Sequence, residues 1–299
     1  MATACYLSNH NMQIVDGSYE GGHLKIQKSD NYEIPAGALI NGVITDEENV
    51  LEVLKQVKTT GVDDMSIVID SGKILVKNEV IPKMKPKEIQ ALCKNELADL
   101  HNDDLDLVYD YRIIRDKLPD GPGMEVMFIA VETALIESYI SVFKTVGIKI
   151  NRIDISINAI SKLCSIYPEL NQKNYILVLV DENDVTSYLF YEGRFVVSNR
   201  SRIFTQRGKM GFVSELSTKI NQLMQFKLDG QSEIKPEKVY IVGLENDDNE
   251  AKAYVDISNF LDTDVSRFIQ SKSVETDSIT KGREVDTTAL YPMGCLIRK

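Results

Sequence analysis

Two stretches of the chain share one order of apolar strands and polar turns. The first, CYLSNHNMQIVDGSYEGGHLKI, begins at Cys5, and the second, YILVLVDENDVTSYLFYEGRFVVSNR, begins at Tyr175. Each pattern is typical of three strands joined by two short turns. Both contain Tyr-Glu-Gly, at 19–21 and 191–193. A match of three residues also arises by chance, so the pattern indicates either a duplicated α/β unit or two unrelated meanders.

The segments that follow each meander alternate between helical and strand patterns. Apolar residues at helical spacing, with Asp46 or Thr45 as a candidate cap and Gly61 as a stop, predict the first helix. Pro86 marks the start of another. The same reasoning gives helices within 44–61, 85–101, 133–147, 208–228 and 249–261, and strands at 65–70, 105–114, 124–131, 148–156 and 237–243. The strands at 105–114 and 124–131 read as a hairpin.

The last part of the chain is more polar. Residues 271–286, SKSVETDSITKGREVD, are rich in turn formers and predict a loop. The final segment, TTALYPMGCLIRK, predicts a short helix in which Pro292 must lie early or cause a kink. Together the segments predict an α/β protein with a first lobe at 1–170, an inserted α+β subdomain at about 75–150, and a second lobe at 171–299. We expect the helix within 287–299 to pack back on the first lobe.

Composition excludes several classes of function. The 299 residues carry a formal net charge of −11, and no basic run interleaved with aromatic residues suggests nucleic acid as a partner. The first residues do not resemble a signal peptide, and no apolar run approaches the roughly 18 residues of a membrane span, so we expect a cytoplasmic protein.

The sequence supports neither a metal site nor a catalytic nucleophile. The four cysteines form no CxxC pair, and the three histidines show no metal-ligand spacing. We therefore expect structural thiols, no metal site and no catalytic residue.

The order of these elements resembles the PilM family of type IV pilus assembly proteins, within the actin-like ATPase superfamily. The resemblance rests on INGVITDEENVLEVLKQV at 40–57, on the hairpin segments with VGIKINRIDIS after them, and on MGCLIRK near the end, which is similar to that family's A-x-G-L-A-L-R signature. FtsA, a cell-division protein, is the next most similar pattern. The resemblance implies a bilobed, ribonuclease H-like fold with an inserted subdomain in the first lobe.

The resemblance also implies where nucleotide would bind, namely at two phosphate hairpins and an adenosine loop. The first hairpin normally reads I-D-I-G-S-S-S-V-K, and here it begins Cys5-Tyr6-Leu7-Ser8. Tyr6 therefore replaces the acid that helps organise Mg²⁺ in the family. In the second, normally D-x-G-x-x-T, Asp181 and Thr186 remain and Asn183 takes the glycine position. Asn accepts a left-handed backbone better than most residues, but its side chain and the flanking acids would crowd a phosphate.

Only Gly243 remains of the glycine-rich adenosine loop, followed by the acidic run ENDDNE at 245–250. The remnants of a cofactor site are thus Asp181, Asn183, Thr186 and Gly243. Ordinary turn chemistry is the favoured explanation for Asp181 and Thr186, and a solvated helix N-terminus is more strongly favoured for the acidic run. We predict no bound cofactor, with weak ATP and Mg²⁺ binding as the alternative.

Two functions remain open at this stage. The resemblance implies either a non-catalytic scaffold, recruited to the inner face of the cell membrane by the N-terminal cytoplasmic peptide of a PilN-like inner-membrane protein, or an actin-like ATPase that drives or regulates assembly. Other components of the pilus platform, including its assembly ATPase, are further candidate partners. The altered hairpins favour the scaffold. An acidic surface suits a basic peptide, although it also serves simply to keep a protein soluble.

Overall fold

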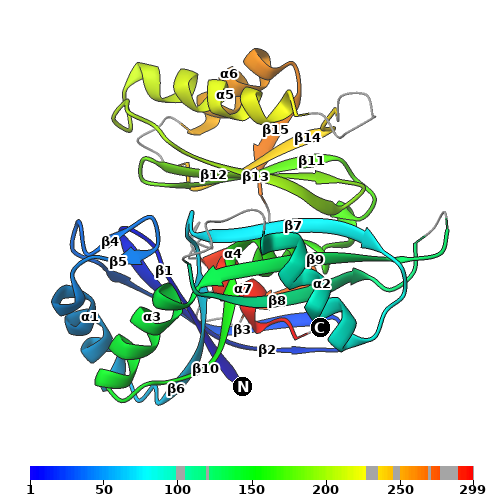
Figure 1. The fold of residues 1–299 in the computed structure, drawn as a ribbon. Coiled ribbons are helices and arrows are strands. Elements are labelled where there is room, and N and C mark those ends of the chain that lie inside the picture. Colours follow the sequence, from blue (N-terminus) through cyan, green and yellow to red (C-terminus); the bar gives the residue numbers. More distant parts are fainter. Residues whose placement is uncertain are drawn as a thin grey trace. The chain divides into compact units, whose positions relative to one another are not determined.

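The computed structural model describes residues 1–98, 105–118, 121–226, 235–244, 250–268, 271–276 and 289–298. These residues divide into two compact units. Unit 1 comprises residues 1–34, 64–69 and 150–299, and unit 2 comprises 35–63 and 70–149. Figure 1 shows the elements of both units.

Unit 1 contains a six-stranded sheet with the strand order β10-β6-β1-β2-β3-β16. Its strands are β1 (Ala2–Leu7), β2 (Asn11–Glu20), β3 (His23–Glu33), β6 (Asp64–Ile69), β10 (Lys149–Ile155) and β16 (Val274–Thr276). The first three form the predicted meander, with antiparallel pairs on both sides of β2. β6 pairs parallel with β1. Part of the loop predicted at 271–286 is instead the short strand β16, which pairs parallel with β3 and buries Val274.

Two helices of unit 1 pack together beside this sheet. The first is α4 (Ser156–Cys164), which is followed by a short 3₁₀ turn, η1 (Pro168–Leu170), and the second is α7 (Leu290–Leu296). All seven residues of α7 are buried, and the helix contacts α4, β1, β2 and β6. Pro292 is the third residue of α7, where a missing N–H costs no intrahelical hydrogen bond.

The second meander begins a five-stranded sheet with the order β13-β12-β11-β14-β15. Its strands are β11 (Tyr175–Asp181), β12 (Asp184–Tyr191), β13 (Arg194–Arg202), β14 (Lys238–Val242) and β15 (Asp264–Arg267). The helices α5 (Met210–Met224) and α6 (Glu250–Leu261) lie side by side over it (Figure 1). Apolar residues of these helices and strands form one buried core, which is why the helical pattern of α5 was readable in the sequence.

Unit 2 contains a three-stranded antiparallel sheet with the order β7-β9-β8. Its elements are β4 (Leu39–Ile40), β5 (Val43–Ile44), α1 (Glu47–Thr59), β7 (Ile74–Ile81), α2 (Pro86–Ala98), β8 (Leu107–Arg115), β9 (Met124–Glu132) and α3 (Thr133–Thr145). The predicted hairpin is confirmed by the pairing of β8 with β9. α2 packs its apolar face on these strands. Asp46 caps α1 by accepting a hydrogen bond from the N–H of Asn49.

Sequence patterns missed β7 and α4. β7 has no clear alternation, because most of its residues are partly exposed on both faces. α4 follows β10 directly, and its N-cap residue, Ile155, makes no side-chain capping hydrogen bond. The usual signal of a helix start is therefore absent from the sequence.

Candidate functional site

The two hairpins named by the sequence lie together in unit 1. The turn between β1 and β2 is built by Ser8, whose N–H donates to the carbonyl oxygen of Asn11 at 2.8 Å and whose hydroxyl accepts hydrogen bonds from the N–H groups of His10 and Asn11. The turn between β11 and β12 closes on the Asp181–Asp184 pair. Both turns are held by local hydrogen bonds, and neither contains a glycine.

Asp184 connects the two turns. Its carboxylate accepts a hydrogen bond from Asn9 Nδ2 at 2.9 Å, and its Oδ2 lies 3.4 Å from His10 Nε2. Arg202 of β13 is near the other carboxylate oxygen, at 3.9 Å. We call the set of Asn9, His10 and Asp184 the hairpin clasp. In the clasp the tips of the two candidate phosphate hairpins bind each other through side chains.

The charges of the clasp shift two pKa values in opposite directions. The close contact with the Asp184 carboxylate raises the pKa of His10, against the smaller opposing effect of burial, and the charges of Asp181, Asp184 and Glu182 add to the rise. Burial favours a higher pKa for Asp184, but the contact with His10, the hydrogen bond from Asn9 and the charge of Arg202 lower that pKa overall. Both shifts favour the charged pair.

Asn183 anchors the chain that follows β13. Its side-chain amide donates to the carbonyl oxygens of Ile203 at 2.7 Å and Thr205 at 3.0 Å. Its own carbonyl oxygen accepts the N–H of Ile203 at 2.8 Å. The neighbouring Glu182, rather than a glycine, adopts a left-handed backbone with φ of 53°. The side chain at the expected glycine position is therefore committed to the protein itself.

Tyr6, at the position of the expected metal-organising acid, lies in a buried group of tyrosines. Its ring packs on that of Tyr291 from α7, with ring centroids 4.5 Å apart. The hydroxyl groups of Tyr291 and Tyr188 share a hydrogen bond of 2.7 Å. We call Tyr6, Tyr188 and Tyr291 the tyrosine cluster. It joins β1, β12 and α7 in the interior of unit 1.

The tyrosine cluster is chemically neutral. Burial raises the pKa of both Tyr188 and Tyr291, in the latter case against hydrogen bonds from Tyr188 and Thr186 that lower it. Neutral phenol groups do not provide the negative charge that a magnesium ion and its water ligands require. The cluster therefore supplies packing and hydrogen bonds where an acid would supply charge.

The remaining predicted residues lie near these groups. Thr186 of β12 is opposite Leu179 and Arg200 in the sheet. Gly243 follows β14, has φ of 91°, and accepts a hydrogen bond at its carbonyl oxygen from the Arg207 guanidinium group. β11 and β14 are parallel neighbours, so Asp181 and Gly243 mark the same edge of the sheet. Of the acidic run at 245–250, all but Glu250 lies outside the described residues.

Sequence reasoning identified Tyr6 and Asn183 but missed their partners. Asn9 and His10 looked like ordinary turn residues, and nothing marked Tyr291 as a neighbour of Tyr6, 285 positions earlier. Such contacts depend on the folded arrangement of β1, β12 and α7. The sequence showed Asp184 as an acid next to Asn183, and this was the one sign of the clasp that the sequence contained.

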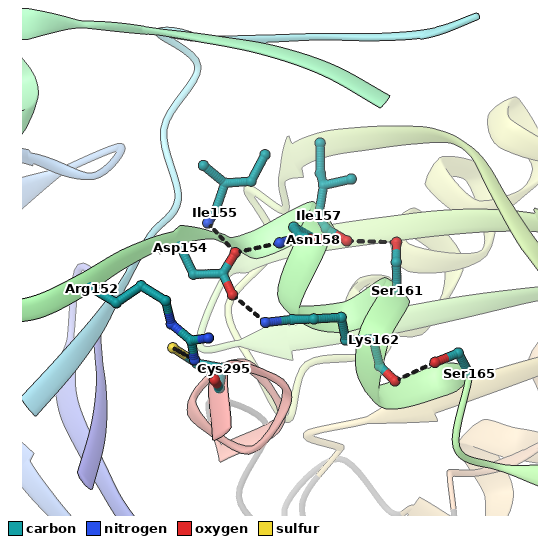
Figure 2. A network of polar contacts seen from close by, with 9 residues as sticks. All are labelled: Arg152, Asp154, Ile155, Ile157, Asn158, Ser161, Lys162, Ser165 and Cys295. Carbon is teal, nitrogen blue, oxygen red and sulfur yellow. Dashed lines mark hydrogen bonds and ion pairs between the residues drawn. The ribbon is translucent and has the colours of Figure 1, made fainter. Parts of the chain in front are cut away.

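A second polar network links the end of β10 to α4 and α7 (Figure 2). Asp154, at the end of β10, accepts hydrogen bonds from Lys162 Nζ at 2.5 Å, Asn158 Nδ2 at 2.7 Å and the N–H of Ile155 at 2.9 Å. Arg152 donates to the carbonyl oxygen of Cys295. Burial, together with the charge of Asp154, raises the pKa of the Cys295 thiol to about 11. The thiol is therefore protonated at neutral pH.

Comparison with known proteins identifies the fold. No family model matches the chain, and no curated protein matches it. Among solved structures, the PilM–PilN type IV pilus biogenesis complex is similar over 99% of this chain and 96% of the other, with 12% identity and a TM-score of 0.75. A Bacteroides thetaiotaomicron protein with an actin-like ATPase fold and unknown function covers 97% and 95%, with 11% identity and a TM-score of 0.51. The chain has the actin-like ATPase fold.

Proposed function

We propose that this protein is a non-catalytic scaffold of a type IV pilus assembly platform. In this role it binds the N-terminal cytoplasmic peptide of a PilN-like inner-membrane protein. The observation that carries the proposal is the similarity to the structure of the PilM–PilN complex along nearly the whole of both chains. A protein that keeps the entire fold of PilM has a framework on which the same kind of partner could bind.

The residues at the two hairpins support a role without ATP. Phosphate binding in a hairpin needs free backbone N–H groups and close approach of the ligand. Here Asp184 links the hairpin tips through Asn9 and His10, and it would add a negative charge beside any phosphate. Tyr6 provides no carboxylate for magnesium, and its ring is packed on Tyr291. The residues present do not fit Mg²⁺ and ATP.

An actin-like ATPase is the second candidate, because Asp181 and Thr186 keep the positions that the motif requires. A fluorescent ATP analogue, titrated with and without Mg²⁺, distinguishes the two. The scaffold proposal expects no saturable signal in either condition.

The proposed location follows from the partner. Within the described part of the chain, no helix is long and apolar enough to cross a membrane. A scaffold of this kind would be held at the cytoplasmic face of the inner membrane by the peptide of its partner. Such peptides carry Lys and Arg beside their transmembrane helix, and the net charge of −11 would attract them.

Calorimetry on the full chain tests the proposal. Synthetic peptides from the N-termini of neighbouring pilus inner-membrane proteins are titrated at two salt concentrations, with scrambled peptides of the same composition as controls. We expect one native peptide to saturate at a ratio of one to one, with weaker binding at high salt. If folded protein binds none of the native peptides, or binds scrambled ones equally well, the scaffold proposal is wrong.

A further inference from the structure

The edge strand β13 and the turn after it differ in charge from the rest of the chain. Between Arg194 and Lys209 the sequence has five basic residues and no acidic one, whereas the whole chain has 45 acidic and 34 basic residues. Arg194 is paired with Glu192 at 2.7 Å, and Arg207 binds Gly243. Arg200, Arg202 and Lys209 are exposed, and Arg202 also lies 3.9 Å from a carboxylate oxygen of Asp184. This segment is a local basic surface on an acidic protein.

β13 also lies at the end of its sheet. Within the described residues it pairs on one side only, with β12, over the register from Arg194 to Arg202. It is nine residues long, whereas β15 at the opposite edge has four. Arg200 and Arg202 are two residues apart and lie on the same face of the strand. An edge of this length presents a row of backbone donors and acceptors to a further strand.

The turn after β13 presents an aromatic side chain on a fixed backbone. Phe204 is 85% exposed. Its N–H and that of Thr205 donate to the two carboxylate oxygens of Glu215, at 2.9 and 3.0 Å. From the other side, Asn183 binds the carbonyl oxygens of Ile203 and Thr205. The hydrogen bonds from the N–H groups of Phe204 and Thr205 lower the pKa of Glu215, so its carboxylate stays charged at neutral pH.

Arginine residues on an edge strand can simply protect it against aggregation. That explanation does not account for Phe204, whose exposed ring is carried on a backbone fixed by hydrogen bonds to Glu215. A ring held on a pre-organised backbone, next to Arg residues, has the composition of a binding hot spot. The combination favours recognition over protection.

We propose that β13 and the 203–205 turn bind an acidic, extended segment of a partner protein, which adds to the sheet as a sixth strand. Backbone hydrogen bonds along β13 would supply affinity, carboxylates of the partner would pair with Arg200 and Arg202, and an apolar side chain would pack on Phe204. The partner segment is acidic, so it differs from the basic peptide of the proposed function. The inference does not depend on that function.

Three peptide probes and two pairs of variants test the proposal on the full chain. The probes are eight-residue peptides: alternating Glu and Val, alternating Lys and Val, and the Glu peptide with Pro in place of every Val. The variants Phe204→Ser and Arg200→Gln/Arg202→Gln are matched by Phe260→Ser, another exposed Phe, and by Lys83→Gln/Lys117→Gln, which removes the same charge elsewhere.

We expect saturable binding of the Glu-Val peptide only. Its affinity should fall about tenfold in Phe204→Ser and in Arg200→Gln/Arg202→Gln, and should be unchanged in the matched control variants. The Pro peptide should not give saturable binding, since proline removes every second N–H donor and its ring fixes a backbone angle that disfavours a paired strand. The proposal is overturned if Phe204→Ser and Arg200→Gln/Arg202→Gln bind the Glu-Val peptide as well as wild type does, or if wild type binds the Pro peptide as well as the Glu-Val peptide. Self-association that Phe204→Ser abolishes would instead identify a second copy of this chain as the occupant and would also overturn it.

Discussion

At the scale of single residues, Gly294 shows how one missing side chain allows two helices to meet. A Cβ atom built on Gly294 of α7 would lie 2.0 Å from the carbonyl oxygen of Ala159 in α4. This is backbone, which cannot turn aside as a flexible side chain can. The glycine of the MGCLIRK segment thus has a packing role, because its absent Cβ permits the contact between α4 and α7.

We therefore expect Gly294→Ala to lower the free energy of unfolding by about 1–3 kcal/mol or more, the usual cost of overpacking. Urea denaturation measures the change. Gly72→Ala is the matched control, because nothing lies within 4 Å of its added Cβ and its backbone is not left-handed. Equal stability of the two variants would contradict this account of the helix contact.

The hairpin clasp predicts a dependence of stability on pH. Because folding raises the pKa of His10, its contribution is fully present below the unfolded value of about 6.5 and is lost as pH rises through the folded pKa. Folding lowers the pKa of Asp184, so its contribution is present above about 3.9 and is lost as pH falls through the folded pKa. The clasp is strongest between these limits.

Replacing His10 should remove the loss of stability that the clasp causes at high pH. Between pH 6 and pH 9, we expect wild type to lose up to about 1 kcal/mol of stability relative to His10→Gln, since the ion pair is partly exposed to solvent. Denaturant midpoints across this range give the measurement, with His23→Gln on the exposed start of β3 as control. If stability changes with pH in the same way in wild type and in His10→Gln, a charge on His10 does not stabilise the clasp.

At the scale of elements, prediction from sequence succeeded where a local pattern carries the information. α1 has a cap at Asp46 and a left-handed stop at Gly61, and α2 begins at Pro86, as predicted. α4 was missed because its position is fixed by tertiary contacts instead. The carboxylate of Asp154 holds Asn158 in the first turn of the helix and Lys162 in the second, and neither contact is visible in the sequence pattern.

The Asp154–Lys162 pair should matter greatly for unfolding. Both side chains are nearly excluded from solvent, at 5% and 4% exposure, so Lys162→Met leaves a buried carboxylate without its counter-charge. We expect a loss of about 3–5 kcal/mol by urea denaturation. Lys173→Met is the matched control, because its pair with Glu237 is about half exposed and should contribute little to stability. Similar losses in both variants would argue against a special role for the buried pair.

At the scale of the whole molecule, the fold was predictable and the state of the candidate site only partly so. The residue patterns alone predicted an α/β protein, and the resemblance to the PilM family implied the actin-like fold, which the similarity to solved structures confirms. The altered positions Tyr6 and Asn183 were also visible. What they do instead was not, since it depends on Tyr291, Asp184 and the 203–205 turn, which only the folded chain brings near.

These alterations lead to the last prediction, that the full chain neither binds nor hydrolyses ATP. A phosphate would meet the carboxylate of Asp184, and Mg²⁺ would find the neutral ring of Tyr6 in place of an acid. Each lost charge-assisted contact is worth roughly 1.5–3 kcal/mol, so their joint loss should weaken affinity at least a hundredfold.

Titration with a fluorescent ATP analogue, with and without Mg²⁺, gives the measurement, and micromolar binding by wild type would contradict the prediction. The double variant Tyr6→Asp/Asn183→Gly tests the cause. It restores the acid and the glycine of the two motifs and frees the 203–205 turn from Asn183. We expect it to regain Mg²⁺-dependent binding, provided that circular dichroism shows a folded protein. The single variant Asn183→Gly, which lacks the acid, should not respond to Mg²⁺, so an equal response from both would assign the loss of binding to the turn rather than to Tyr6.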